Sequence, residues 1–165
     1  METTLDLYKV GRVIGKGAFG KVNLALHRLT RKLVAIKSIK KKHMEDENEK
    51  KKLVQEIEIL KKLKHESHIK LLETFQTATH ICIVLELCPG GDLLSYVRKR
   101  RKLSELQAKY IFKQIIQGLQ YLEKVNVVHR DIKLENILLD GFGRVKIGDF
   151  GVSVKIDGPN AVLFE

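Results

Sequence analysis

The sequence predicts an α+β fold with two lobes, the first rich in β-strands and the second helical. Up to Leu87 most apolar residues alternate with a period of two, the period of a half-buried strand, apart from one helical stretch. Later they recur three or four positions apart, as on one face of a helix. The two regions meet at Pro89-Gly90-Gly91, which interrupts both patterns. Strands followed by helices across one break favour an α+β layout.

The first lobe is predicted to begin with an antiparallel meander of three strands. Residues 8–14 are rich in apolar side chains and end in the glycine cluster GKGAFG, and residues 21–26 and 33–39 alternate with period two. Two further strands are predicted over residues 69–75 and 81–87. Together these segments form the sheet expected in the first lobe.

An amphipathic helix is predicted over residues 44–63. Its apolar residues recur three or four apart, with charged residues between them: Leu53, Ile57, Leu60 and Leu63.

The region after the Pro-Gly-Gly break is predicted to be helical to about residue 125. Ser104 and Gln107 have the spacing of a capping box, which marks the start of a helix. Short apolar runs follow at residues 127–128, 137–139 and 145–147.

Composition excludes several classes of protein. The 165 residues are 44% hydrophobic and 31% charged, which is typical of a globular domain, and no run of about 18 apolar residues occurs. Cys82 and Cys88 are too few for a disulfide framework, and the N-terminus lacks the layout of a secretory signal. We therefore expect an intracellular, cytoplasmic protein that does not enter a membrane.

The formal net charge of +11 comes largely from short runs of lysine and arginine. Proteins that bind single-stranded nucleic acid need aromatic residues interleaved with the basic ones, and none are interleaved with these runs. A solvated basic surface is favoured, and a patch for an acidic partner is the alternative. Nucleic acid is not expected as a partner.

The glycines of Gly15-x-Gly17-x-x-Gly20 would fit a dinucleotide fingerprint only if a helix followed them directly. A strand pattern follows instead, which disfavours that interpretation. A glycine loop between antiparallel strands can lay backbone N–H groups over phosphates, with Phe19 shielding the site and Val22 covering an adenine ring. A purely structural hairpin is the alternative.

Lys37 lies in the alternating segment VAIK and is predicted to reach the α- and β-phosphates of a nucleotide. It needs a carboxylate to hold it, and the long helix offers Glu56, with Leu60 one turn later on the same face. A lysine on the surface of an edge strand is the alternative.

The densest cluster of chemically useful residues is HRDIKLEN, residues 129–136, followed by Asp149-Phe150-Gly151. Asp131 can accept the proton of a substrate hydroxyl, and Lys133 can neutralise charge on a transferred phosphoryl group. Asn136 and Asp149 carry the hard oxygen ligands that Mg²⁺ prefers.

These segments resemble, in order, the motif set of the eukaryotic protein kinases. GKGAFGKV resembles the glycine-rich loop, VAIK the strand lysine, HRDIKLEN the catalytic loop and GDFG the metal-binding turn. The resemblance covers residues 8–156. Lys133 resembles the Ser/Thr branch, and the sequence is most similar to the calcium/calmodulin-dependent and AMP-activated kinase group.

The resemblance implies a protein-kinase-like two-lobed fold, the cofactors ATP and Mg²⁺, and a protein substrate with Ser or Thr. Arg130 resembles the arginine that pairs with a phosphorylated activation loop, which implies an upstream activating kinase. Leu85 is expected to be the gatekeeper. The expected catalytic residues are Asp131, Lys133, Lys37 and Glu56, with Glu56 pairing with Lys37, and the metal ligands are Asn136 and Asp149. The expected ATP-binding residues are Gly15, Lys16, Gly17, Ala18, Phe19, Gly20, Val22, Ala35, Lys37, Glu86, Cys88, Asp92 and Leu138; Glu86 to Cys88 would contact adenine and Asp92 would lie near the ribose.

The resemblance also predicts an incomplete kinase domain over residues 8–165. It divides into a complete β-rich N-lobe at about 8–87, a hinge at 88–91 and a partial helical C-lobe at 92–165. Because the family pattern continues beyond this point, we expect the isolated chain to bind nucleotide weakly and to transfer phosphate poorly or not at all. A nucleotide-binding or protein-interaction module is the alternative function. Without later helices, apolar side chains of the helix after Ser104 would be exposed: Tyr110, Ile111, Ile115 and Leu119.

Overall fold

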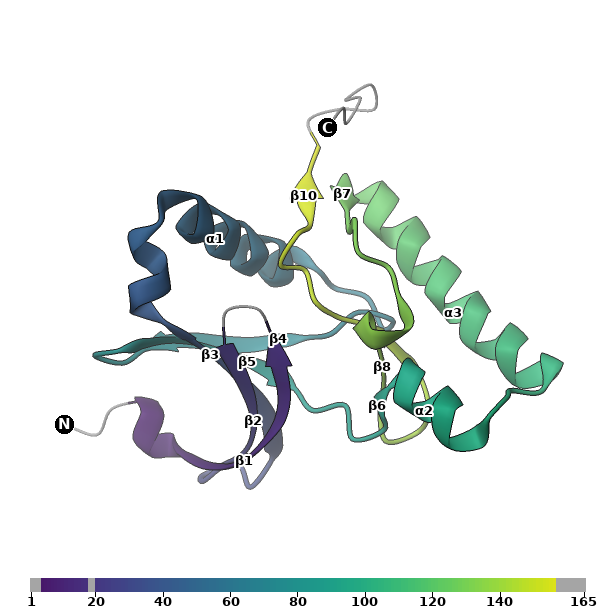
Figure 1. Ribbon diagram of the computed structural model, residues 1–165, viewed down its shortest axis with the longest axis horizontal. Helices are drawn as coiled ribbons and strands as arrows, with labels where there is room; N and C mark the ends of the chain where they lie inside the picture. Colours follow the sequence, from purple (N-terminus) through teal and green to yellow (C-terminus); the bar gives the residue numbers. More distant parts are fainter. Residues whose placement is uncertain (1–3, 18–19, 157–165) are drawn as a thin grey trace. The chain divides into compact units, whose positions relative to one another are not determined.

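The computed structural model describes residues 4–17 and 20–156, which group into two compact units (Figure 1). The first unit contains the described residues up to Val54 together with Lys70–Leu87. The second contains Gln55–Ile69 and the described residues from Cys88 onward. The predicted α+β content is confirmed, with a sheet in the first unit and the longest helix in the second.

The first unit is built on an antiparallel sheet of five strands in the order β1-β2-β3-β5-β4. A 3₁₀ helix, η1 (Thr4–Leu7), precedes it. The strands are β1 (Tyr8–Gly17), β2 (Gly20–His27), β3 (Leu33–Lys40), β4 (Leu71–Gln76) and β5 (His80–Glu86). The predicted meander is confirmed, but β1 runs on through the first glycines to Gly17, past the predicted end at Ile14. Backbone groups of glycine can form the hydrogen bonds of an edge strand as those of other residues do. The start of the glycine cluster therefore did not mark the end of β1.

Alternation along these strands sends side chains to two different faces of the sheet. One face carries a buried apolar cluster, in which Tyr8 stacks on Phe75 with ring centroids 5.8 Å apart. The remaining members of the cluster come from the three central strands: Ala25, Val34, Ile36, Cys82 and Val84. Lys37 follows Ile36 and therefore points to the opposite face.

The predicted long helix is shorter than expected. Residues 41–45 form a 3₁₀ turn, η2 (Lys41–Glu45), and the α-helix α1 spans Glu47–Lys62. Asp46 explains the late start, because its Oδ1 accepts hydrogen bonds from the backbone N–H groups of Asn48 at 2.8 Å and Glu49 at 3.4 Å. A side chain that satisfies the first free N–H groups of a helix fixes where it begins.

Besides the end of α1, from Gln55 onward, the second unit combines two helices with short strands. These elements are β6 (Gly91–Asp92), α2 (Leu93–Arg100), α3 (Glu105–Lys124), β7 (Val127–Val128), η3 (Leu134–Asn136), β8 (Ile137–Leu139), β9 (Val145–Ile147) and β10 (Val154–Lys155). β6, β8 and β9 form one antiparallel sheet, and β10 pairs with β7. The helical region predicted to extend to residue 125 is thus two helices with a break between them. Ser104 and Gln107 form the predicted capping box of α3.

α3 lies against β9 at Gly118. A Cβ atom there would come within 2.7 Å of Ile147 Cδ1, so any larger residue would force the buried Ile147 side chain to shift. The predicted exposure of α3 is partly wrong, because Ile111 is buried at 8% exposure while Tyr110 is 55% exposed. The other exposed large apolar side chains of α3 are Leu106, Phe112 and Ile116. Among the described residues, no helix is long and apolar enough to span a membrane.

Candidate active site

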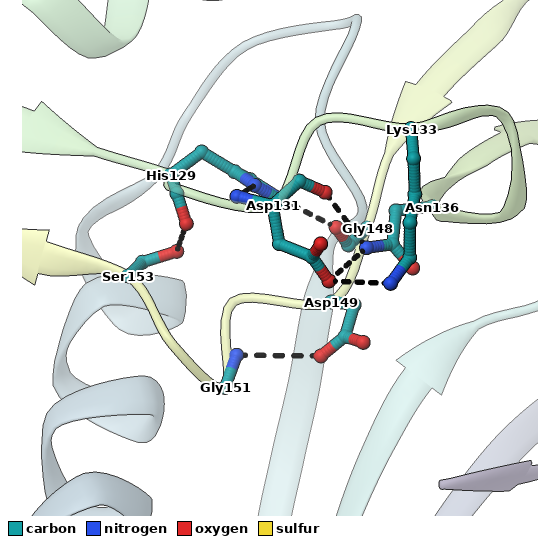
Figure 2. A network of polar contacts seen from close by, with 8 residues as sticks. All are labelled: His129, Asp131, Lys133, Asn136, Gly148, Asp149, Gly151 and Ser153. Carbon is teal, nitrogen blue, oxygen red and sulfur yellow. Dashed lines mark hydrogen bonds and ion pairs between the residues drawn. The ribbon is translucent and has the colours of Figure 1, made fainter.

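Asp131 and Lys133, in the loop between β7 and η3, converge with Asn136 at the end of η3 (Figure 2). The Asp131 carboxylate accepts a hydrogen bond from Asn136 Nδ2 at 2.8 Å and pairs with Lys133 Nζ at 2.9 Å, both through Oδ2. Asn136 Nδ2 also donates to the Asp131 backbone carbonyl at 2.8 Å. Three residues that the sequence predicted to act together are therefore brought together within one unit.

The charges of this group reinforce one another. The Lys133 ammonium, with help from the Asn136 amide, holds the pKa of Asp131 below its usual range. The Asp131 carboxylate in turn raises the pKa of Lys133. Asp131 is thus a carboxylate near neutral pH, suited to accepting a hydrogen bond from a hydroxyl and orienting its oxygen, and Lys133 stays cationic.

Asn136 is oriented so that its amide oxygen is available to a cation. Both of its side-chain hydrogen bonds are made by Nδ2, which leaves Oδ1 as the free acceptor atom. The residue is 7% exposed, and its backbone is held on both sides: its N–H donates to Lys133 and its carbonyl accepts from Gly148. A fixed amide oxygen is a plausible Mg²⁺ ligand.

Asp149 lies in the same unit, at the turn after β9. Its φ of 55° is in the left-handed region, and its Oδ1 accepts a hydrogen bond from the Gly151 N–H at 3.3 Å. Such strained backbone is common at functional sites. Glu56, buried at 6% exposure, lies beside this turn, because a Cβ atom at Gly151 would be 3.6 Å from its Oε2.

The donor set fits Mg²⁺. Asn136 and Asp149 offer hard oxygens, and the described residues contain no group of three or more His, Cys, Asp or Glu side chains that could hold a metal. Mg²⁺ is commonly bound by one or two protein ligands together with substrate phosphates and water.

Residues to which the sequence assigned no role hold this loop in place. Phe150 is 1% exposed and packs edge-on against His129, with ring centroids 4.9 Å apart. His129 Nε2 donates to the Gly148 carbonyl at 2.8 Å, and its Nδ1 accepts from the Asp131 N–H at 3.2 Å. Ser153 Oγ donates to the His129 carbonyl at 3.1 Å. His129 stood in the predicted motif, whereas no sequence signal marked Ser153.

Arg130 also has a positive φ, 65°, and its Nε donates to the Val152 carbonyl at 2.7 Å. This bond connects the loop of residues 129–136 to the segment after Gly151. The predicted pairing of Arg130 with a phosphorylated loop stays a prediction.

His68 is a buried histidine next to this support. It is 2% exposed, and its ring centroid lies 5.8 Å from that of Phe150. Its Nε2 donates to the Gly118 carbonyl at 2.9 Å, and its Nδ1 has no hydrogen-bond partner among the described residues. Burial lowers the pKa of His68 to about 4; the Gly118 bond opposes this, while the nearby basic side chains of His65, His129 and Lys146 add to it.

Acid is expected to destabilise the fold through His68. Because its pKa is lower in the folded than in the unfolded state, unfolding takes up a proton at mildly acidic pH. The stabilisation is complete above pH 6.5 and is lost as the pH falls toward 4, by at most about 3 kcal/mol. Denaturant unfolding from pH 7 to 4.5 should show a shallower pH dependence for His68→Leu than for the unmodified chain.

The matched control is His43→Gln, which changes an exposed histidine. This variant should keep the full pH dependence of the free energy of unfolding. Equal slopes for His68→Leu and the unmodified chain would contradict the assignment.

In the first unit the glycine segment forms a strand-to-strand hairpin. Gly15 is in register with Val22, Lys16 with Lys21 and Gly17 with Gly20. The strand after the glycines, rather than a helix, excludes the dinucleotide fingerprint. Ala18 and Phe19 lie outside the described residues.

Val22, Ala35 and Lys37 lie on one face of this sheet. Val22 is opposite Lys37 in the β2–β3 register, and Ala35 is two residues from Lys37 on the same strand. Leu85, the expected gatekeeper, is opposite Ala35 on β5. Val22, Ala35, Lys37 and Leu85 thus share one surface, on the face away from the apolar cluster. Lys16 and Glu86 are instead in register with residues of the other face.

The remaining predicted residues already have structural partners. Glu86 Oε1 accepts from the Lys70 N–H at 2.8 Å. The Cys88 carbonyl accepts from the Gly91 N–H at 3.1 Å, closing the turn before β6. Asp92 caps α2 by accepting from Ser95 N and Ser95 Oγ, both at 2.8 Å, a role that the sequence did not predict. Leu138 is opposite Asp92 in the β6–β8 register.

Comparison with known proteins gives matches over most of the chain. The family described as protein kinase domain matches residues 8–163. NUAK family SNF1-like kinase 1 of Homo sapiens is 42% identical over 146 residues, which are 88% of this chain and 22% of that protein. NUAK family SNF1-like kinase 2 of Homo sapiens is 44% identical over 146 residues, 88% of this chain and 23% of that protein. Serine/threonine protein kinase OSK3 of Oryza sativa subsp. indica is 43% identical over 149 residues, 90% of this chain and 29% of that protein. The chain therefore spans less than a third of the length of these relatives.

Proposed function

Because this chain belongs to the protein kinase family, we propose that it transfers the γ-phosphoryl group of ATP to serine or threonine hydroxyls of proteins. The observation that carries the proposal is the Asp131 carboxylate, held by Lys133 and Asn136 in the unit that also contains Asp149. This set can orient a hydroxyl and neutralise charge on phosphate, which is what phosphoryl transfer demands of a protein.

In the proposed mechanism the second unit acts on the hydroxyl and the transferred group. Asp131 accepts the hydrogen bond of the attacking hydroxyl and takes its proton as the new O–P bond forms. The bond between the γ-phosphorus and the bridging oxygen breaks in the same step, and ADP leaves with the electron pair of that bond. Lys133 stabilises negative charge on the phosphoryl oxygens. Asn136 Oδ1 and the Asp149 carboxylate would hold Mg²⁺, which would neutralise negative charge on the phosphates of ATP. No covalent enzyme intermediate is needed.

The first unit is proposed to hold the nucleotide. Gly15 to Gly20 would place backbone N–H groups over the phosphates, Lys37 would contact the α- and β-phosphates, and Val22 and Ala35 would cover the adenine. Glu56 is proposed as the carboxylate partner of Lys37. We propose in addition that Glu86, Cys88, Asp92 and Leu138 line the nucleotide site; for Asp92 this role must be compatible with its capping of α2.

The preference for serine and threonine rests on Lys133 and on the relatives, one of which is named a serine/threonine protein kinase. An intracellular location fits an ATP-dependent enzyme whose cysteines, Cys82 and Cys88, form no disulfide. The protein substrate and an upstream activating kinase belong to the proposal and await identification.

Mg·ATP is expected to stabilise the chain against unfolding. A ligand that binds only the folded state at 100 times its Kd adds about 2.7 kcal/mol to the free energy of unfolding. Thermal unfolding with Mg·ATP, with ATP and EDTA, and with Mg²⁺ alone measures this effect. The largest shift is expected with Mg·ATP, and the absence of any nucleotide effect would contradict the proposed site.

The net charge of +11 suggests a separate control. A nucleic-acid binder would show salt-dependent binding to DNA and no response to nucleotide. We expect the reverse.

A second candidate function is a nucleotide-binding or protein-interaction module that transfers no phosphate. The exposed apolar side chains of α3 favour it, with Leu106 at 79% and Phe112 at 62% exposure. This candidate predicts stabilisation by Mg·ATP without any transfer, which separates it from the first.

A further inference from the structure

The first unit contains a hollow to which the proposed function assigns no ligand. Its volume is about 760 Å³, which lies within the range of small-molecule sites. Ser38 and Cys82 lie in its floor, and the turn Thr77–Thr79 forms part of its wall. Cys82 is buried at 3% exposure, so the floor is set by packed strands rather than by mobile side chains.

The hollow lies on the opposite face of the sheet from Lys37. Lys21, Ser38 and Cys82 form one row across β2, β3 and β5, and side chains in register share a face. Lys37 is the neighbour of Ser38 on β3, so its side chain points the other way. A ligand in the hollow would therefore not occupy the face that carries Val22, Ala35 and Lys37. Of the described residues proposed to hold ATP, its lining includes Lys16 and Gly20 of the glycine segment.

The described side chains around the hollow carry charge of one sign. Among residues 4–17 and 20–156, its lining includes the basic side chains of Lys16, Lys21, Lys40, His43 and His80, and no aspartate or glutamate. None of the ion pairs formed by the described residues includes the three lysines. The acidic residue adjoining the lining in sequence is Asp6, which follows Leu5 and has a polar partner of its own. Like charges gathered in this way favour a bound anion.

The floor is neutral and offers hydrogen bonds. Ser38 Oγ and Cys82 Sγ are 3.8 Å apart, close enough for a hydrogen bond to sulfur. Burial raises the pKa of the Cys82 thiol, an effect that the Ser38 contact opposes, so the thiol stays uncharged and does not repel an anion. The turn in the wall is fixed, because Thr77 Oγ1 accepts from the backbone N–H groups of Thr79 and His80.

We propose that this hollow is a second ligand site, which binds a phosphate monoester independently of ATP. A phosphate monoester carries a charge of about −1.5 to −2 at neutral pH, which suits several cations better than a single carboxylate does. Lysine ammonium groups bind phosphate as point charges, without the planar geometry that arginine imposes. The volume also leaves room for an organic group against Leu5 and Ala78.

Two sources could supply this chemistry, a free small molecule or a phosphorylated side chain of a protein. Isothermal titration of the full chain with phenyl phosphate, and separately with a short phosphoserine peptide, distinguishes them. Binding of phenyl phosphate assigns the site to small molecules, and binding of the peptide alone assigns it to a phosphorylated segment. Failure of both ligands to bind at millimolar concentration overturns the proposal.

The decisive variant is Lys21→Gln with Lys40→Gln. It should weaken binding by about 10-fold or more, since two charged contacts are lost. A matched pair on α1, Lys51→Gln with Lys61→Gln, changes the net charge equally but should alter affinity less than about twofold. An equal loss of affinity in the two double variants would show that only the overall charge matters, and it would overturn the proposed site.

Two further measurements separate the hollow from the proposed nucleotide site. Lys37→Met should leave phenyl phosphate binding unchanged, whereas a loss as large as that of the Lys21 and Lys40 pair would place the phosphate with ATP instead. Benzoate, which has one negative charge, should bind about 10-fold more weakly than phenyl phosphate. Equal affinity for benzoate would overturn the assignment to phosphate. These outcomes do not depend on whether the chain transfers phosphate.

Discussion

Replacing Asp131 with asparagine is expected to slow phosphoryl transfer by about 10²–10⁴-fold, the range of a positioned general base. The substitution keeps the shape of the side chain. In the unmodified chain Asn136 Nδ2 and Lys133 Nζ share one carboxylate oxygen of Asp131, and the Oδ1 of the asparagine can accept from both in its place. What disappears is the negative charge that orients the attacking hydroxyl and takes its proton. Initial rates on a serine peptide at saturating Mg·ATP measure the change.

The matched control for Asp131→Asn is Glu135→Gln, which removes one negative charge from an exposed position in the same loop. Its rate should stay within about threefold of the unmodified chain, because screened surface charges contribute little. The stabilisation by Mg·ATP should be the same in both variants. A rate for Asp131→Asn that matches that of Glu135→Gln would remove Asp131 from the mechanism.

Asp149→Asn is expected to abolish the difference between Mg·ATP and metal-free ATP. A metal in such a site contributes several kcal/mol to the transition state, so transfer should fall by at least about 100-fold. Asparagine tolerates positive φ well, and the φ of 55° at this position should therefore persist. Loss of function would then reflect the missing carboxylate rather than a disrupted turn.

Stabilisation of Asp149→Asn by ATP and by Mg·ATP is the measurement, with metal-free adenosine as the control ligand. Adenosine needs no metal and should stabilise the variant as it stabilises the unmodified chain. A Mg²⁺ effect that survives in Asp149→Asn would mean that the cation is held elsewhere.

Local sequence patterns predicted much of this fold. Period-two alternation located the strands of the first unit, and the spacing of Ser104 and Gln107 located the start of α3. Asp131, Lys133 and Asn136 lie within one short loop, so their contacts follow from a local turn that a sequence motif can encode.

Contacts between distant segments could not be predicted in the same way. His68 and Phe150 are far apart in the chain, and only the folded structure shows that their rings are in contact. Ser153 supports His129 across a similar distance, and a serine carries no pattern that marks it. The resemblance to protein kinases places Asp92 near the ribose. Its capping of α2 was not predicted, because it depends on where that helix begins.

The hollow on the first unit also lies beyond sequence reasoning. Lys21, Ser38 and Cys82 come from three strands, and their common face depends on register. A lysine run shows a positive charge in the sequence, but not whether the lysines gather around a cavity.

The central claim is best tested by phosphate transfer itself, measured with the chain in excess over labelled ATP so that even a slow reaction is seen. The substrate is a peptide mixture containing serine, threonine and tyrosine. The account predicts Mg²⁺-dependent label on serine and threonine, little on tyrosine, and a signal with Asp131→Asn at least about 100-fold lower. Bound Mg·ATP with no transfer above the Asp131→Asn background would contradict it.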